Sequence, residues 1–231
     1  HDVELRVRAI VHRDVDTLYS DVMMVSVTPY EVDYPKLYVP GSYQGWDAAN
    51  ENTAIYSVLD NGVYEGYLYF SEETTELKFL KVPAWEEDNT IGDPDPSGTS
   101  GTLQIGSWGG NNIKVSGGPG YFLIGANLNA KTYSSLLTDW GLIGSATPGG
   151  WDSDQDMTWD DQQQIWTITL DLSPGEMKFR ANDDWGLNYG DDDANGTLEK
   201  GGGNIAVAEA GNYTITFNLQ KPPYRYTVVK N

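Results

Sequence analysis

The sequence contains no cysteine and only two histidines, His1 and His12. Without cysteine there are no disulfides, no thiolate metal sites and no cysteine nucleophile. Because both histidines lie near the first residue, the rest of the chain can assemble neither a Ser/His/Asp triad nor a histidine metal cluster. A carboxylate pair for glycoside hydrolysis stays open among the 34 acidic residues. The sequence therefore offers little support for catalysis, and it predicts neither a cofactor nor a metal.

Basic residues are also scarce. The chain has 14 Lys and Arg against 34 Asp and Glu, which gives a net charge of −20. Such a chain repels nucleic acid and anionic lipid surfaces, because both are bound through Lys and Arg. It also disfavours acidic polysaccharides, so a polymeric ligand should be neutral.

Long hydrophobic runs are missing as well. No stretch of eighteen apolar residues occurs, so no segment predicts a membrane-spanning helix. No signal-peptide pattern opens the chain, which we interpret as a mature chain or a fragment of a longer protein. No window reads as a capped amphipathic helix. Residues 128–142 come closest, and they predict a helical turn.

Short alternating runs and turn-forming residues dominate what is present. The chain has 26 glycines and 39% hydrophobic residues. In residues 166–172 and 213–219, apolar and polar residues alternate, which predicts half-buried β-strands. The sequence therefore predicts an all-β chain of antiparallel β-sandwiches.

Several blocks occur twice in the same order, which predicts an internal duplication. Each copy of one octet begins with Lys-Phe and ends in Trp. The matched blocks are GSYQGWD (41–47) with TPGGWD (147–152), NGVYEGYLYF (61–70) with QQIWTITLDL (163–172), KFLKVPAW (78–85) with KFRANDDW (178–185), and NNIKVSGGPGY (111–121) with GNIAVAEAGNY (203–213).

This pattern divides the chain into three parts. Residues 1–33 predict two strands and a linker, with the strands ending at Pro29. Because a lone hairpin is only marginally stable in water, we interpret this part as the tail of a preceding domain. Residues 34–127 and 128–231 predict two tandem sandwiches of roughly 90–110 residues each. We expect the chain to be a monomer.

Tryptophans at matched loop positions are the candidate binding residues. Indole covers the C–H face of a sugar ring, while nearby Lys, Arg, Asn or Gln serve its hydroxyls. The alternative is that these tryptophans cap the open end of each sandwich. Trp108, in a glycine-rich loop, has no counterpart in the second copy and stays undecided. The candidates are Trp46, Trp85 and Lys81 in the first copy, and Trp151, Trp185, Arg180 and Asn182 in the second.

Acidic clusters raise the possibility of calcium, which takes oxygen ligands from loops. They lie at residues 93–96, 182–184 and 190–196. The last cluster has part of the spacing of a hand-type calcium loop, but its glycine and distal glutamate do not follow that pattern. The alternative interpretation is a solvated turn.

Essentially the whole sequence resembles the SusE/SusF family of outer-membrane lipoproteins of starch-utilisation systems, most specifically in the second copy. The resemblance rests on repeat sequences and on an opening that resembles the last strands of the family's N-terminal immunoglobulin-like domain. The segments are VELRVRAIV (3–11), LYSDVMMVSVTPY (18–30), LYVPGSYQGWD (37–47), GLIGSATPGGWD (141–152), MTWDDQQQIWTITLDLSPGEMKFRANDDWGLNYGDD (157–192) and GGGNIAVAEAGNYTITFNL (201–219).

The resemblance implies a non-catalytic, surface-exposed lipoprotein that holds a glycan beside an outer-membrane porter. Its starch-binding members use a pair of aromatic residues with a Lys or Arg. Carried over, this favours Trp46, Trp85 and Lys81 in one site and Trp151, Trp185 and Arg180 in the other, with Tyr189 as a further candidate. The anchor itself is not in this chain.

The first functional hypothesis is therefore tandem binding of a neutral glycan, with starch-type α-glucan as the first choice. Three alternatives remain at this point. The same sites could bind a different neutral glycan, the chain could be a structural or adhesive β-domain spacer without a ligand, or it could be a glycoside hydrolase accessory region with a carboxylate pair.

Overall fold

The structure is a computed structural model that describes residues 2–5, 8–9, 17–26 and 32–231. It divides into two compact units, His1–Asp33 and Tyr34–Asn231. His1, His12 and Pro29 lie outside the described residues. Nearly every regular element is a strand, and every pairing is antiparallel, which confirms the all-β prediction.

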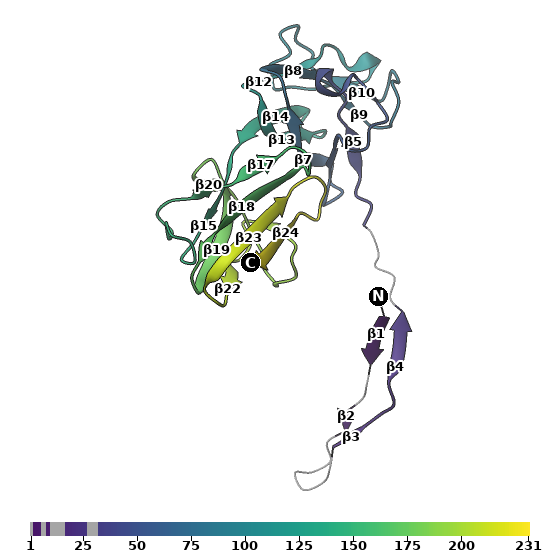
Figure 1. Ribbon diagram of the computed structural model, residues 1–231. Helices are drawn as coiled ribbons and strands as arrows, with labels where there is room; N and C mark the ends of the chain where they lie inside the picture. The colour runs from purple at the N-terminus through teal and green to yellow at the C-terminus, as the bar shows by residue number, and fades with distance from the viewer. Residues whose placement is uncertain (1, 6–7, 10–16, 27–31) are drawn as a thin grey trace. The chain divides into compact units, whose positions relative to one another are not determined.

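The described residues of the first unit form four short strands. β1 (Asp2–Leu5) pairs with β4 (Met23–Ser26), and β2 (Arg8–Ala9) pairs with β3 (Leu18–Tyr19). Figure 1 shows these four strands in purple near the N-terminus. The hairpin predicted for this part of the chain is therefore present.

The second unit contains two modules whose strands follow the same order. In the first module the hydrogen-bonded path is β11-β10-β9-β5-β6-β7-β13-β14, with β12 and β8 as a separate pair. Its strands are β5 (Lys36–Tyr38), β6 (Ala54–Tyr56), β7 (Val63–Phe70), β8 (Thr74–Leu77), β9 (Phe79–Leu80), β10 (Thr90–Gly92), β11 (Gln104–Ile105), β12 (Ile113–Ser116), β13 (Gly120–Asn127) and β14 (Thr132–Thr138). Two 3-10 turns, η1 (Ser42–Gln44) and η2 (Ser107–Gly109), accompany them.

The second module repeats this path as two sheets. One has the order β16-β15-β19-β20-β21 with β22 beside β19, and the other has the order β17-β18-β23-β24. Its strands are β15 (Trp140–Ile143), β16 (Gln155–Asp156), β17 (Thr158–Asp160), β18 (Ile165–Leu172), β19 (Gly175–Ala181), β20 (Asp184–Gly190), β21 (Glu199–Lys200), β22 (Ile205–Val207), β23 (Gly211–Asn218) and β24 (Arg225–Lys230). The repeated order is what a duplicated sandwich produces.

The segment 128–142 corrects the predicted helical turn. Residues 132–138 form β14, which pairs with β13 over seven residues. Thr132, Tyr133 and Thr138 favour extended backbone, and cross-strand pairing holds them there. Because β14 completes the first sheet, the structural boundary lies at Asp139 rather than after Asn127.

Alternating burial explains the strands of the second module. Ile215 and Phe217 on β23 are fully buried, whereas Thr214 and Thr216, which alternate with them, lie on the other face. Trp166 on β18 is buried too. The predicted inward faces of these strands are therefore confirmed.

Strands β7 and β13 of the first module are buried on both faces. Leu68 and Phe122 pack into the core of the first module, while Tyr67 and Tyr121 join the core of the second. Tyr121 lies 4.3 Å from Trp159, measured between ring centroids, and Tyr67 stacks on Tyr121 at 5.7 Å. Figure 1 shows β7 and β13 next to β17, at the place where the two modules meet. The modules therefore share one aromatic junction instead of being joined by a flexible linker.

The strand registers correct one detail of the predicted repeat. Phe70 faces Gly120 across β7 and β13, and Leu172 faces Gly211 across β18 and β23. Phe122, not Tyr121, is therefore the counterpart of Tyr213. A shift of one residue moves a side chain to the opposite face of the sheet, which is why Tyr121 is free to serve the junction.

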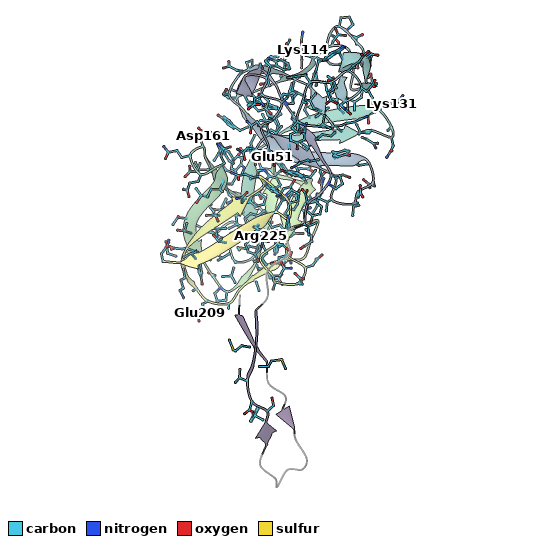
Figure 2. All side chains as sticks on the ribbon, turned by 90° about the vertical axis from the view of Figure 1, so that its right-hand side faces the viewer. Glu51, Lys114, Lys131, Asp161, Glu209 and Arg225 are labelled. Atoms are coloured by element: carbon cyan, nitrogen blue, oxygen red, sulfur yellow. The ribbon has the colours of Figure 1, made fainter. Side chains whose placement is uncertain are left out.

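Most charged side chains lie outside these cores, whereas Lys78, Asp93, Arg180 and Asp191 are buried. Figure 2 shows Lys114, Lys131, Asp161 and Glu209 at the margins of the modules. No helix in the described part of the chain has the length and apolar character needed to cross a membrane.

Candidate functional site

Each module brings its two loop-borne tryptophans together. The ring centroids of Trp46 and Trp85 are 6.1 Å apart with an interplanar angle of 47°. Those of Trp151 and Trp185 are 6.0 Å apart at 39°. Trp85, Trp151 and Trp185 are 38%, 39% and 46% exposed, and Trp46 is half-buried. Each module thus presents a tilted pair of indole rings to solvent.

A tight hairpin carries Trp185. Asn182 and Asp183 both have positive φ, 56° and 54°, and connect β19 to β20 as a two-residue turn. Positive φ at both central positions matches a type I′ turn, for which Asn and Asp are well suited. Trp185 is the second residue of β20, so its position is set by the sheet. The acidic cluster 182–184 is therefore a hairpin turn.

Arg180 lies beneath Trp185. Its guanidinium carbon is 4.7 Å from the centre of the Trp185 ring, within the range of a cation–π contact. Its Nε donates to Asp154 Oδ2 at 3.0 Å, and its Nη2 lies 2.7 Å from Asp154 Oδ1. Burial raises the pKa of the Asp154 carboxyl, and the Arg180 guanidinium opposes that rise. Arg180 is only 7% exposed, and its Nε and Nη2 contact Asp154, so its main visible role is to support Trp185.

Two of the predicted contact residues have structural roles. Asn182 donates from Nδ2 to the carbonyl of Leu137 at 2.9 Å, and its Oδ1 accepts from the backbone N–H of Asp139 at 2.8 Å. It therefore ties the hairpin turn to the segment between the modules. Tyr189 is 2% exposed, and its ring lies 5.7 Å from that of Trp140. The prediction of Tyr189 as a surface contact is wrong, because the strand that starts at the rim with Trp185 has entered the core by this residue.

The first module positions its pair differently. Trp46 has a positive φ of 63°, which costs a bulky residue about 1–2 kcal/mol and persists only where the surroundings hold it. The Gln44 side chain holds this turn by donating to the Asp47 carbonyl at 2.7 Å and accepting from the Asp47 N–H at 2.6 Å. Trp85 lies in the irregular loop between β9 and β10. Lys81, in the same loop, is exposed and makes no side-chain hydrogen bond or ion pair to the described residues.

The two modules differ beneath the rings. Leu80 on β9 occupies the place of Arg180, because each directly follows the matched Lys-Phe pair. The strand registers place Asn52, which is exposed, at the position of Asp154. The first module therefore has no counterpart of the buried ion pair, and the only exposed cation of its octet is Lys81.

A buried lysine, missed from the sequence, supports a further loop of the first module. The Lys78 Nζ lies 2.8–3.3 Å from four carbonyl oxygens, those of Trp108, Gly109, Gly110 and Asn111. Lys78 is 8% exposed, and burial lowers the pKa of its ammonium group. The sequence did not predict these contacts, because Lys78 and the carbonyl of Trp108 are thirty residues apart in the chain.

Two acidic loops are organised around single aspartates. Asp191 accepts hydrogen bonds from the backbone of Asp193, Asn195 and Gly196, and from the Tyr226 hydroxyl at 2.9 Å. Burial alone raises the pKa of Asp191, but these donors together hold it below its usual range. The same arrangement recurs in the first module, where Asp93 accepts from Ser100 and from the Tyr133 hydroxyl at 2.7 Å.

The Asp191 and Asp93 carboxylates are therefore engaged within their own loops. The described residues contain no group of three or more acidic or histidine side chains placed to hold a metal ion. In both loops the hydrogen bonds that the central aspartate accepts hold the turn together.

Comparison with known families finds a match for the second module. Residues 140–225 match the model described as SusF/SusE starch specific CBMs, that is, carbohydrate-binding modules. This part of the chain is similar to the SusF/SusE modules. The matched segment begins at the first residue of β15 and contains Trp151, Arg180 and Trp185. The match supports carbohydrate binding by the second module.

A search of solved structures returned the crystal structure of SusF from Bacteroides thetaiotaomicron. The identity is 18% and the TM-score is 0.35, with 100% of this chain and 58% of that chain covered. This chain therefore spans little more than half the length of that protein. No curated protein matches the sequence significantly.

Proposed function

We propose that the chain is a non-catalytic glycan-binding protein in which each module holds a neutral polysaccharide on its tryptophan pair. The observation that carries this proposal is the repeated pair itself, Trp46 with Trp85 and Trp151 with Trp185, at centroid distances of 6.1 and 6.0 Å. Large indoles in solvent on both copies are costly unless they meet a ligand, and their faces complement the C–H face of a sugar.

We propose starch-type α-glucan as the ligand. The rings of each pair are inclined by 47° and 39°, so they complement a curved chain better than a flat ribbon. An α(1→4)-glucan is curved, whereas a β(1→4)-glucan is extended. The family description of the matched module, starch specific, supports the same choice.

The shared junction affects how two sites would act on one polymer. Because Tyr67 and Tyr121 pack into the core of the second module, the two tryptophan pairs keep a fixed spacing. Two sites that engage one chain raise avidity by roughly 10²–10⁴ over a single site when their geometry allows it. We propose that the protein acts at the outer membrane as part of a surface lipoprotein, beside a glycan porter.

The test is calorimetric titration with maltoheptaose and a panel of neutral β-glucans. We expect two maltoheptaose molecules per chain, and one after Trp185→Ala. Because Trp185 is 46% exposed, its removal should leave the thermal midpoint nearly unchanged. The matched variant is Trp85→Ala, which should remove the other molecule.

Other results would separate the alternatives. Binding of a β-glucan without maltoheptaose would reject the α-glucan but keep the glycan-binding function. No binding of any glycan would favour a structural spacer. Release of reducing sugar from starch would contradict the non-catalytic proposal.

A further inference from the structure

Trp108 is the most exposed tryptophan among the described residues, and it lies on a surface loop. Its exposed fraction is 55%, above those of Trp85 and Trp185 in the two pairs. It lies in η2, in the glycine-rich loop that joins β11 to β12. The function proposed above makes no use of it.

The backbone holds Trp108 in a conformation that a bulky residue rarely adopts. Trp108 has φ 60° and ψ 17°, and Ser107 before it has φ 46°. Such conformations persist where surrounding contacts enforce them, and they gather at ligand-binding sites. Here the enforcing contact is the buried Lys78 ammonium, which lies within hydrogen-bonding distance of the carbonyls of residues 108–111.

The loop of Trp108 packs onto the segment that follows Trp85. The Trp108 N–H donates to the Glu87 carbonyl at 3.0 Å, and the Gly106 N–H donates to the Thr90 carbonyl at 3.0 Å. Glu87 is only two residues beyond Trp85. Consecutive Cα atoms are about 3.8 Å apart, so the backbone of Trp108 lies beside a segment only two residues from Trp85.

The second module lacks this feature. There, only residues 201–204 lie between β21 and β22, and they contain three glycines and an asparagine. In the first module, residues 106–112 lie between the corresponding strands β11 and β12. The longer loop is therefore the specific addition of the first module, and Trp108 is its one aromatic residue.

We infer that Trp108 is a third aromatic subsite of the first module, which takes a further sugar ring of the neutral glycan held by Trp46 and Trp85. The inference rests on the proposed function. Lys78 already holds the loop that carries Trp108. Little conformational entropy is therefore lost when Trp108 contacts a sugar, and the contact increases affinity. The first module then engages a longer stretch of glycan than the second.

The test uses the full chain carrying Trp185→Ala, so that only the first module binds. Maltotriose and maltoheptaose are titrated into this chain, and into the same chain with Trp108→Ala or Trp108→Phe added. We expect Trp108→Ala to lower maltoheptaose affinity about threefold to tenfold, the size of an aromatic contact. Maltotriose affinity should change less than about twofold, and Trp108→Phe should restore most of the loss.

A matched series in the Trp85→Ala chain reports on the second module, where Trp108→Ala should change nothing. Equal maltoheptaose affinity with and without Trp108 would overturn the subsite while leaving the proposed function intact. An equal loss for both oligosaccharides, or a loss in the second module, would also overturn it, because the effect would then be on the fold. If neither the Trp185→Ala chain nor the unaltered chain binds maltoheptaose, the result rejects the α-glucan proposal. It then also rejects the subsite, which rests on that proposal.

Discussion

Replacing Arg180 with leucine is expected to destabilise the second module by about 3–5 kcal/mol. The substitution removes the guanidinium that bonds Asp154 at 3.0 and 2.7 Å, and the side chain of that aspartate is only 2% exposed. An unpaired carboxylate would then remain buried, which is more costly than the absence of both charges. The measurement is the free energy of unfolding from urea titration, followed by the signal of the second module.

The control for this prediction removes both charges. The double variant Arg180→Leu with Asp154→Ala leaves no carboxylate without a partner, and leucine is the residue that the first module has in place of Arg180, at Leu80. It should recover most of the lost stability, to within about 1 kcal/mol, and the coupling energy follows from the double-mutant cycle. A double variant as unstable as Arg180→Leu alone would show that the ion pair does not govern the stability of this site.

Replacing Tyr67 with alanine is expected to cost about 3–5 kcal/mol and to separate the unfolding of the two modules. Tyr67 is 3% exposed, and its ring lies 5.7 Å from Tyr121, 5.6 Å from Tyr224 and 6.1 Å from Trp140. Because these rings join the two cores, the unaltered unit should unfold in one transition and the variant in two. Differential scanning calorimetry measures both effects.

Tyr67→Phe is the matched control. It keeps the ring and removes only the 3.3 Å contact between the hydroxyls of Tyr67 and Tyr189, so it should cost about 1 kcal/mol and keep the single transition. Two transitions in the unaltered chain, or a single one in Tyr67→Ala, would contradict the shared junction.

The sequence predicted features that depend on local pattern. Alternation at residues 213–219 identified the inward face of β23, and the duplicated octet placed Trp85 and Trp185 at matched positions. The pairing of each with a second tryptophan was also expected, and the centroid distances of 6.1 and 6.0 Å place those rings together. Their role in glycan binding stays a prediction.

Features that depend on contacts distant in sequence were missed. Asp154 lies twenty-six residues from Arg180, and Lys78 lies thirty residues from the first carbonyl that it approaches. Comparison of the two copies carried a signal for the first case, because the other module has Leu80 in place of Arg180 and an uncharged Asn52 in place of Asp154. The two copies differ in the same way at Tyr67 and Tyr121. The matched positions of the second module are polar, Thr169 and Asn212, so the two tyrosines are specific to the first module.

The measurement that tests the central claim most directly is maltoheptaose binding by the chain with Trp85→Ala and Trp185→Ala together. Both rings are more than a third exposed, so the double variant should keep its fold, as judged by circular dichroism and its thermal midpoint. If the tryptophan pairs are the binding sites, this folded variant binds no maltoheptaose, whereas the unaltered chain binds two molecules. A folded double variant that binds maltoheptaose as well as the unaltered chain would contradict the account.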